Sequence, residues 1–352
     1  MANEVDDLEI DPEESSEDLF ERLNLKIDKG QEPMRLDKFL VARIEGASRN
    51  KIQQAIEAGK VLINGKQVPA NHRIKPGEEL VVYSDKEVHG EEILPQQMAL
   101  NIVFEDDDIL IINKPVGLVV HPASGNPSGT LINGVAWYLQ QQNNDITADN
   151  LPRFGLVHRI DKNTSGLMVL AKTDKAVSSL SKEFFNHTID RIYIALVWGD
   201  VVADSGTIVA HVGRHQRFRK IFDAYPDGEH GKDAITHYKV LERLGYVTLV
   251  QCKLETGRTH QIRVHMKHIG HPLFNDELYG GDRIVKGTVF TKYKQFVDNC
   301  FAMCPRHALH AKTIGFTHPR TRQPISFDSA MPADMEGVIE KWRTYVRPKN
   351  MM

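Results

Sequence analysis

The chain has 352 residues, of which 41% are hydrophobic and 26% charged, a composition typical of a globular protein. No apolar run reaches the roughly 18–20 residues needed to cross a bilayer, and the acidic N-terminus excludes a secretory signal, so we expect a cytoplasmic protein without a membrane anchor. Three cysteines give neither an even disulfide framework nor a C-x-x-C pair, which also favours a reducing compartment.

The net charge of −3 conceals an uneven distribution of charge along the chain. Residues 1–21 hold ten Asp or Glu and no Lys or Arg, so the rest of the chain carries a net charge of +7. A mildly basic body is compatible with a polyanionic partner. We expect residues 1–33 to form an acidic, disordered tail that helps to keep the protein in solution.

An amphipathic pattern begins after this tail. Apolar residues at helical spacing from Leu36 predict a short helix, and a second helix is expected between Ser48 and Gly59. Asn64-Gly65, set between short apolar strands, predicts a β-hairpin. This order of helix, helix and hairpin, with the motifs R-L-D-K-F-L and G-K-V-L-I-N-G-K, resembles the S4 RNA-binding module.

The S4 resemblance implies an RNA-binding surface on residues 34–83. This segment holds nine Lys or Arg against five Asp or Glu, a balance of +4. Cations there would bind RNA phosphates and make the affinity depend on salt. The residues expected to do so are Arg35, Lys38, Arg49, Lys51 and Lys60. Residues 84–100 lack clear periodicity and are expected to form a linker.

A larger domain is expected over residues 101–346. Its first buried strand, Ile109–Ile112, runs into N-K-P-V-G, a turn enforced by Pro115 and Gly117 in which Lys114 is expected to shape the floor of a cleft. Periodicity then predicts a helix over 174–187 and strands over 191–198, 206–212, 235–243 and 246–255.

The last part of this domain is expected to be less regular. The motif G-R-T-H-Q-I-R-V-H-M, which begins at Gly257, is expected to lead into a helix, and Phe316 lies in a late strand. Residues 280–305 are expected to form a long irregular insertion, a mobile loop that contacts RNA.

The segment 158–172 reads H-R-I-D-K-N-T-S-G-L-M-V-L-A-K and places Asp161 between two cations in a polar loop that enters an apolar run. This pattern predicts a functional loop mounted on a core strand. A carboxylate is ionised at neutral pH and can act as nucleophile or base without an activating partner. Burial would raise its pKa, and a neighbouring guanidinium, either Arg159 or the distant Arg263, would oppose that shift.

Together with N-K-P-V-G and R-I-Y-I-A-L-V, these motifs resemble the pseudouridine synthases that include the large-subunit ribosomal RNA enzymes. The resemblance implies an α+β fold with a mixed, largely antiparallel sheet and a central RNA cleft. It implies that Asp161 is catalytic, that Arg263 pairs with it and that Tyr193 stacks on the target base. Arg159 would help to extrude the uridine, and Val264 would pack on the other side of the base.

The implied reaction converts specific uridines in RNA to pseudouridine, and it requires no cofactor. Neither G-x-x-x-x-G-K-[ST] nor G-x-G-x-x-G occurs in the chain. The histidines at 260, 265, 268 and 271 are spaced as metal ligands can be, but they lack an H-E-x-x-H pattern. We therefore expect no metal site, and backbone or RNA-phosphate contacts for these side chains.

The order of the modules most resembles enzymes of the ribosomal large subunit, so a monomer that acts on 23S-type rRNA is expected. The first alternative is a tRNA pseudouridine synthase of the same family. The second is a noncatalytic, S4-containing RNA-binding or ribosome-assembly protein. A carboxylate hydrolase would need a second acidic residue beside Asp161, and neither the Asp161 loop nor the Arg263 segment offers one.

Overall fold

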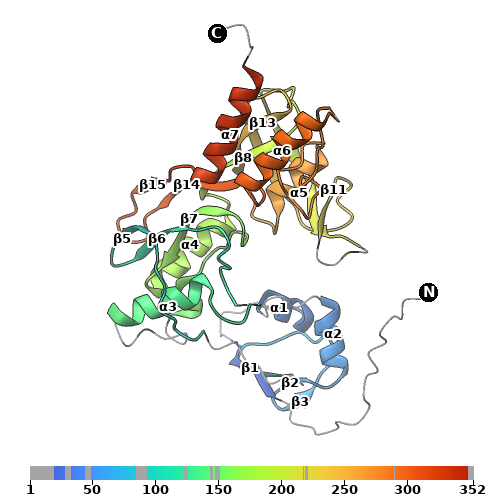
Figure 1. Ribbon diagram of the computed structural model, residues 1–352. Coiled ribbons are helices and arrows are strands. Elements are labelled where there is room, and N and C mark those ends of the chain that lie inside the picture. The colour runs from blue at the N-terminus through green and yellow to red at the C-terminus, as the bar shows by residue number, and fades with distance from the viewer. Residues whose placement is uncertain are drawn as a thin grey trace, which may run out of the picture. The chain divides into compact units, whose positions relative to one another are not determined.

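The computed structural model describes residues 20–27, 33–43, 49–84, 93–122, 126–142, 146, 151–216, 218, 221–288 and 290–347. The chain forms two units, Met1–Glu92 and Ile93–Met352, and each has its own hydrophobic core (Figure 1). None of the helices in the described ranges has both the length and the apolar character needed to cross a membrane.

The N-terminal unit combines two helices with a four-stranded sheet of order β1-β4-β2-β3. Its elements are β1 (Phe20–Lys26), α1 (Leu36–Arg43), α2 (Arg49–Glu57), β2 (Val61–Ile63), β3 (Lys66–Gln67) and β4 (Glu79–Ser84). Asn64 and Gly65 form the turn between β2 and β3 with φ of 51° and 72°, the left-handed values that a two-residue hairpin turn requires. The two predicted helices and the predicted hairpin are confirmed.

Strand β1 corrects the expected extent of the N-terminal tail. Residues 20–26, which were expected to be disordered, pair antiparallel with β4, and Leu23 and Leu25 pack against the core of the unit. The alternation of these leucines was a strand signal, but the acidic stretch around it masked that signal. Residues 1–19 and Ser48, the expected helix cap, lie outside the described residues.

The C-terminal unit begins earlier than the expected residue 101. Ile93 is buried in its core, and the backbone carbonyl of Leu94 accepts a hydrogen bond of 2.8 Å from the Asn133 side chain. Residues 93–100 therefore belong to the larger unit and are not part of a linker.

The C-terminal unit is built on a mixed, largely antiparallel sheet, as expected. Its strands follow the order β5-β6-β7-β14-β8-β13-β12-β9, β15 pairs with β14, and β7 with β14 is the parallel pair. The strands are β5 (Ile102–Glu105), β6 (Ile109–Lys114), β7 (Ser165–Ala171), β8 (Asp190–Trp198), β9 (Ser205–Val209), β12 (Ile235–Arg243), β13 (Val247–Leu254), β14 (Leu309–Thr317) and β15 (Pro324–Asp328). Strands β10 (His211–Arg214) and β11 (Phe222–Tyr225) form a separate hairpin.

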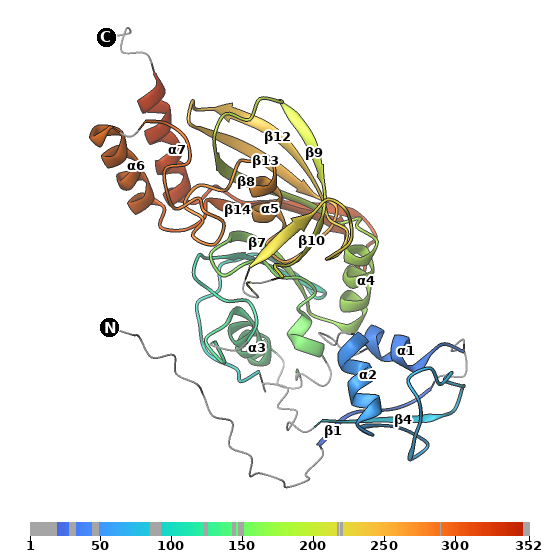
Figure 2. The same cartoon turned by 90° about the vertical axis from the view of Figure 1, so that its right-hand side faces the viewer.

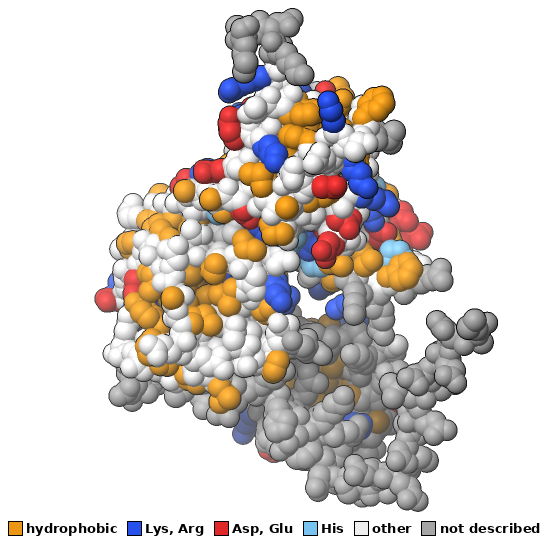
Figure 3. Space-filling view, in the orientation of Figure 1, with side chains coloured by type: hydrophobic (Ala, Val, Ile, Leu, Met, Phe, Trp, Pro, Cys, Tyr) orange, Lys and Arg blue, Asp and Glu red, His pale blue; other side chains and the backbone are white. Residues whose placement is uncertain are grey.

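Helices cover both faces of this sheet (Figures 1 and 2). The covering elements are α3 (Leu131–Gln142), a 3₁₀ turn (Pro152–Gly155), α4 (Asp174–Phe185), α5 (Gln261–His268), α6 (Thr291–Met303) and α7 (Ala333–Val346). Tyr193 and Ala195 of β8 face a core shared with α3 and α5, whereas Ile194 and Leu196 face a core shared with α6 and α7. Burial on both faces explains why β8 reads as a continuous apolar run. On the face of the C-terminal unit shown in Figure 3, hydrophobic side chains lie among polar and charged ones.

Helix α6 corrects the prediction of an irregular insertion over residues 280–305. Tyr293, Val297 and Cys300 are buried and pack in one core with Trp342 of α7. Their spacing of three and four residues is that of an apolar helical face. This segment is therefore part of the packed core, and the prediction of a mobile RNA-contacting loop was wrong for α6.

Candidate active site

A cavity of about 470 Å³ in the C-terminal unit brings together segments that are distant in sequence. Its walls come from the Asp161 loop, the end of α4, the start of β8, the segment that enters α5 and the start of β14. Asp161, Arg159, Tyr193 and Arg263 all line it. Asp161 is the one carboxylate among the described residues that line this cavity.

Asp161 and Arg263 form an ion pair inside the cavity. Nη1 of Arg263 donates to Oδ2 of Asp161 at 3.0 Å, and their side chains are 5% and 22% exposed. Burial raises the pKa of Asp161, but the charges of His260, Arg263 and His307 outweigh burial and hold this pKa below its ordinary value. Because burial lowers the pKa of both histidines, Arg263 is the cation that persists at neutral pH. Asp161 is thus an ionised carboxylate in a largely enclosed site.

Asp276 fixes the orientation of Arg263. Its two carboxylate oxygens accept hydrogen bonds from Nε and Nη2 of Arg263, both at 2.8 Å, and its side chain is 1% exposed. The guanidinium therefore bridges two carboxylates and lies 4.9 Å from the centroid of the Tyr279 ring. A bidentate grip of this kind restrains both the position and the plane of an arginine. The sequence analysis missed Asp276, because no motif or spacing connects it to Asp161.

His260 closes the same side of the cavity. It precedes α5 with φ of 58°, a left-handed conformation, and its Nε2 lies 3.8 Å from Oδ1 of Asp161. Its Nδ1 lies 2.8 Å from the hydroxyl of Tyr279, and the ring of Phe222 meets it edge-on. The buried imidazole is neutral at neutral pH, because burial lowers its pKa. Tyr279 and Phe222 were also missed from the sequence.

Lys114 ties the Asp161 loop to the turn that follows β6. Its side chain is fully buried, and its Nζ donates to the carbonyls of Pro115 at 2.9 Å, Leu118 at 2.9 Å and Lys162 at 3.0 Å. The amide of Gly117 also donates to the carbonyl of Lys162 at 2.9 Å. Three backbone acceptors around one ammonium group support a structural role beneath the loop, in agreement with the expectation from sequence.

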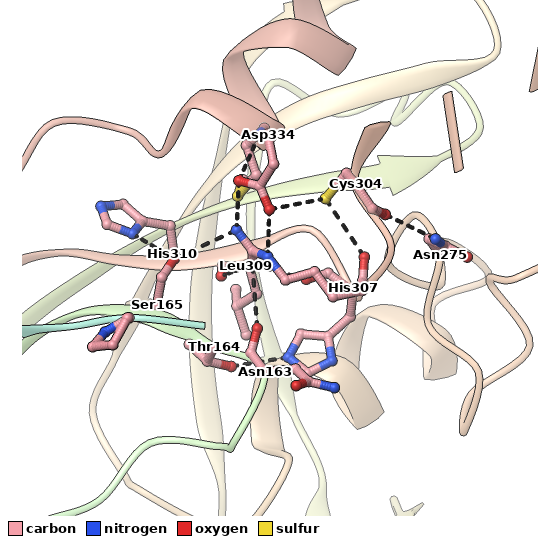
Figure 4. Close-up of polar contacts among 12 residues, drawn as sticks. Asn163, Thr164, Ser165, Asn275, Cys304, His307, Leu309, His310 and Asp334 are labelled. Carbon is pink, nitrogen blue, oxygen red and sulfur yellow. Dashed lines mark hydrogen bonds and ion pairs between the residues drawn. The ribbon is translucent and has the colours of Figure 1, made fainter. Parts of the chain in front are cut away.

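A second buried cation, Arg306, holds the other side of the loop. Its Nη1 donates to the carbonyl of Asn163 at 3.2 Å, while Nε and Nη2 donate to Asp334 at 2.7 and 3.0 Å. His307 and Thr164 face each other with 3.0 Å between Nε2 and Oγ1 (Figure 4). Arg306 and His307, which directly precede β14, thus restrain the segment that directly follows Asp161.

Val264 follows Arg263 in helix α5. Its side chain is 1% exposed, packs with Val212, Ala234 and Tyr279 in a core cluster and is not part of the described cavity wall, so its contact with the base stays a prediction. Ile262 and Arg263 of α5 line the cavity, and the next residue, Val264, lies in the core cluster. Apolar wall contacts come instead from Leu254, Ile262 and Leu309.

The site lies within a region that matches a known family. The sequence model of the family described as RNA pseudouridylate synthase matches residues 108–268, and that of the S4 domain matches residues 34–80. An RNA pseudouridine synthase of Chlorobaculum parvum is 42% identical over 92% of this chain and 98% of its own. The chain belongs to the RNA pseudouridine synthase family. Ribosomal large subunit pseudouridine synthase D of Neisseria meningitidis is 40% identical over 88% of this chain and 79% of its own.

The fold of the synthase is also found among solved structures. Human RNA pseudouridylate synthase domain containing 4 superposes with a TM-score of 0.54, at 19% identity, over 69% of this chain and 93% of that chain. This likeness concerns the fold alone. It agrees with the mixed sheet and the helical covering of the C-terminal unit.

The S4 domain of the synthase presents some of the expected cations in a fixed arrangement. Asp37, whose side chain is fully buried, accepts from Arg35 at 2.9 Å and from Arg49 at 3.0 Å, and it thereby holds two half-exposed guanidinium groups on one side of α1. Lys38 is exposed and Lys60 is half-buried. The side chain of Lys51 lies outside what the structure describes.

The histidines of the synthase that suggested a metal site are not gathered into one. His265 is buried and bonds Thr236, and His271 bonds the carbonyl of Trp198 at 2.8 Å. Within the described ranges, a group spaced for a metal ion consists of Asp106, Asp108 and His318. His318 there contacts Asp106 at 2.7 Å and Arg320 contacts Asp108, so both acids already have side-chain partners.

Proposed function

We propose that this synthase isomerises uridines of large-subunit rRNA to pseudouridine and that Asp161 is its catalytic residue. The observation that carries the proposal is the ionised, restrained carboxylate of Asp161 in a cavity whose wall also holds Tyr193. The large-subunit substrate is supported by the name of the Neisseria meningitidis relative, and similar relatives of Pseudomonas aeruginosa and Xanthomonas campestris carry the same name. This favours rRNA over the tRNA alternative.

The reaction breaks the N1–C1′ bond of the uridine, turns the uracil and joins it to the ribose through C5. Asp161 either attacks C1′ or removes a ribose proton, and both routes use its ionised form. Arg263 keeps this carboxylate charged within the enclosed cavity. To complete the product, the proton at C5 leaves to water or Asp161 and N1 gains a proton from water, so the overall reaction is an isomerisation.

A uridine inside folded RNA must first leave its stack, which costs a few kcal/mol. Stacking on an aromatic side chain returns about 1–3 kcal/mol per base, and Tyr193 is the aromatic residue of β8 in the cavity wall. Arg159, which is exposed at the cavity, is positioned to help displace the uridine from the RNA stack. A cavity of about 470 Å³ falls in the usual range for a bound small-molecule-sized group.

Hydrolysis is a weaker candidate for this cavity. Asp276 is the acid nearest to the Asp161–Arg263 pair in this network, but both of its oxygens bind Arg263 and it is 1% exposed. A hydrolase that acts through two carboxylates needs the second one free to donate a proton or to bind a metal ion. Asp276 is not free for either task.

The S4 domain supplies RNA affinity in this proposal, and the C-terminal unit supplies the chemistry. Exposed Lys38 and the paired Arg35 and Arg49 would contact phosphates and release counterions. We further propose that the synthase acts as a monomer in the cytoplasm, where ribosomal precursors are available.

The test is pseudouridine mapping, by carbodiimide-induced reverse-transcription stops, on total RNA from a strain that lacks the gene. The strain is complemented with wild type, Asp161→Asn or the exposed control Asp282→Asn. Signals that are lost from large-subunit rRNA and restored by wild type and Asp282→Asn, but not by Asp161→Asn, support the proposal. Loss confined to tRNA would replace the substrate, and restoration by Asp161→Asn would remove Asp161 from the mechanism.

A further inference from the structure

Arg191 is a buried cation in the cavity wall without an acidic partner among the described residues. It is 7% exposed, its Nη2 donates to the backbone carbonyl of Glu255 at 3.1 Å, and its Nε has no hydrogen-bond partner. Its guanidinium carbon lies 5.5 Å from the centroid of the Phe184 ring, which also stacks with His158. One carbonyl and one aromatic face are weak compensation for a full buried charge.

The acids closest to Arg191 along the chain have other partners. The carboxylate of Glu255 pairs with His237, and that of Asp190 pairs with Lys253 at 2.6 Å. Asp161, the carboxylate that lines the cavity, is bound by Arg263. Burial accordingly lowers the pKa of Arg191, and the nearby charge of Arg258 lowers it further. Within the described part of the chain, the positive charge of Arg191 therefore has no acidic partner.

Arg258 adds a second cation to the same wall. It lines the cavity, and its Nε donates to the backbone carbonyl of Asp233 at 2.9 Å without an ion pair in the described part of the chain. Gly257, beside it, lies so close to Arg191 that a Cβ there would be 2.6 Å from Nη1. The glycine thus lets the backbone of this loop approach the guanidinium. Two unpaired arginines then share one side of the cavity.

The position of Arg191 relates this charge to the expected base site. Arg191 and Tyr193 are two residues apart on β8, so their side chains leave the same face of the strand about 6.6 Å apart. A nucleotide whose base lies against Tyr193 would therefore place a backbone phosphate near Arg191. Guanidinium groups bind phosphate oxygens with paired, charge-assisted hydrogen bonds.

We propose that Arg191 and Arg258 form a phosphate subsite that binds the RNA backbone next to the target uridine. The proposal rests on the proposed function, because it places the uridine in the cavity beside Tyr193. The substrate supplies the counter-ion that Arg191 lacks in the free protein. Binding of the phosphate at this point fixes the ribose relative to Asp161, so the subsite contributes to the register of the substrate as well as to its affinity.

The test is a double-mutant cycle in which the arginine side chain, the phosphate charge of the RNA, or both are removed. The probe is a stem-loop RNA that carries a uridine mapped by the experiment above, with a neutral methylphosphonate at its 5′ or 3′ phosphate. Equilibrium binding of the full chain is measured from low to moderate salt for wild type, Arg191→Gln, Arg191→Lys, Arg258→Gln and the exposed control Arg347→Gln. Circular dichroism confirms that each variant is folded.

We expect wild type to bind the RNA with one of the two neutral linkages about tenfold more weakly than native RNA. Arg191→Gln should bind that RNA and native RNA with equal affinity. Arg191→Gln should also lower the slope of log affinity against log salt by about 0.7–0.9, and Arg191→Lys should recover most of that slope. Arg258→Gln should show a smaller change of the same kind, and Arg347→Gln should show none of the linkage-specific change.

Two results would overturn the subsite. Wild type could bind both neutral linkages as tightly as native RNA, or Arg191→Gln could lose as much further affinity from the neutral linkage as wild type does. In either case Arg191 has a structural role only. If no uridine depends on the gene, the proposed function fails, and the subsite falls with it. If a uridine does depend on the gene, but the losses of affinity from Arg191→Gln and from the neutral linkage are additive, only the subsite is overturned.

Discussion

Arg263 reaches back 102 residues to bind Asp161 through Nη1 at 3.0 Å. The same guanidinium is gripped by both oxygens of Asp276, so one buried cation joins an acid that faces the cavity to one that does not. The two carboxylates differ in exposure. The side chain of Asp161 is 22% exposed and lines the cavity, whereas that of Asp276 is 1% exposed and holds the cation from behind.

We predict that Asp276→Asn slows turnover while RNA affinity stays within about twofold. Asparagine offers one acceptor oxygen and no charge, so Arg263 loses its bidentate restraint. Small displacements in an active site can cost up to about 100-fold in rate, and we expect a loss of about 10–100-fold. Single-turnover rates on a mapped stem-loop measure this. Asp282→Asn, at an exposed aspartate, is the matched control, and an equal rate for both variants would contradict the orienting role of Asp276.

The pH dependence of the rate should report the ionisation of Asp161. Its pKa is held below the ordinary value of about 3.9, so the rate should be present above that pH and fall only when the pH drops below it. In Arg263→Gln, burial remains and the permanent cation is gone, so the pKa should rise and the acidic limb should move to higher pH. Single-turnover rates across the acidic range test this. An unmoved limb would show that Arg263 does not control the charge of Asp161.

Lys114→Met should destabilise the C-terminal unit and slow the reaction. The substitution removes the common donor of three carbonyl groups and the fully buried ammonium group, and we expect a loss of about 2–4 kcal/mol in the free energy of unfolding. Chemical denaturation gives this value. Lys175→Met, at an exposed position of α4, is the control and should change stability by less than about 0.5 kcal/mol. Equal stability of the two variants would argue against Lys114 as the anchor of the loop.

Gly166→Ala should be among the most destabilising single-methyl changes in the chain. Gly166 has φ of +118°, and a Cβ there would lie 2.1 Å from the carbonyl oxygen of Ala311 on the parallel neighbour β14. Gly270→Ala is the control, because its φ of +86° is also unfavourable but no atom lies within 4 Å of the added methyl. We expect about 1–2 kcal/mol from backbone strain alone in the control and at least about 3 kcal/mol in Gly166→Ala. Similar losses would mean that β14 moves to accept the methyl.

A chain that contains only residues 93–352 should fold and retain chemistry. The C-terminal unit has its own core and all residues of the cavity. Without the S4 domain we expect weaker RNA binding and a lower salt slope, but conversion of a minimal stem-loop at saturating enzyme. Circular dichroism and single-turnover assays measure these. A folded but inactive truncated protein would show that the S4 domain does more than bind RNA.

Several elements could be predicted because their signals are local. The Asn64-Gly65 turn depends on two adjacent residues that tolerate positive φ, and β8 depends on an uninterrupted apolar run. The Asp161 loop was recognisable because its polar and apolar parts adjoin in the chain. Helix α6 carried a local signal too, in the spacing of Tyr293, Val297 and Cys300, but the irregular residues before it hid the pattern.

The sequence by itself determined the order of the two units and most of the strands, and it pointed to Asp161, Tyr193 and Arg263, which line one cavity. The tertiary structure decided which groups surround them: Asp276 behind Arg263, and Arg191 without an acid in the cavity wall. The tertiary structure also placed the side chain of Val264 in a core cluster. Local patterns follow from backbone preferences within a few residues, whereas charge pairing and side-chain direction depend on how distant strands and helices pack together.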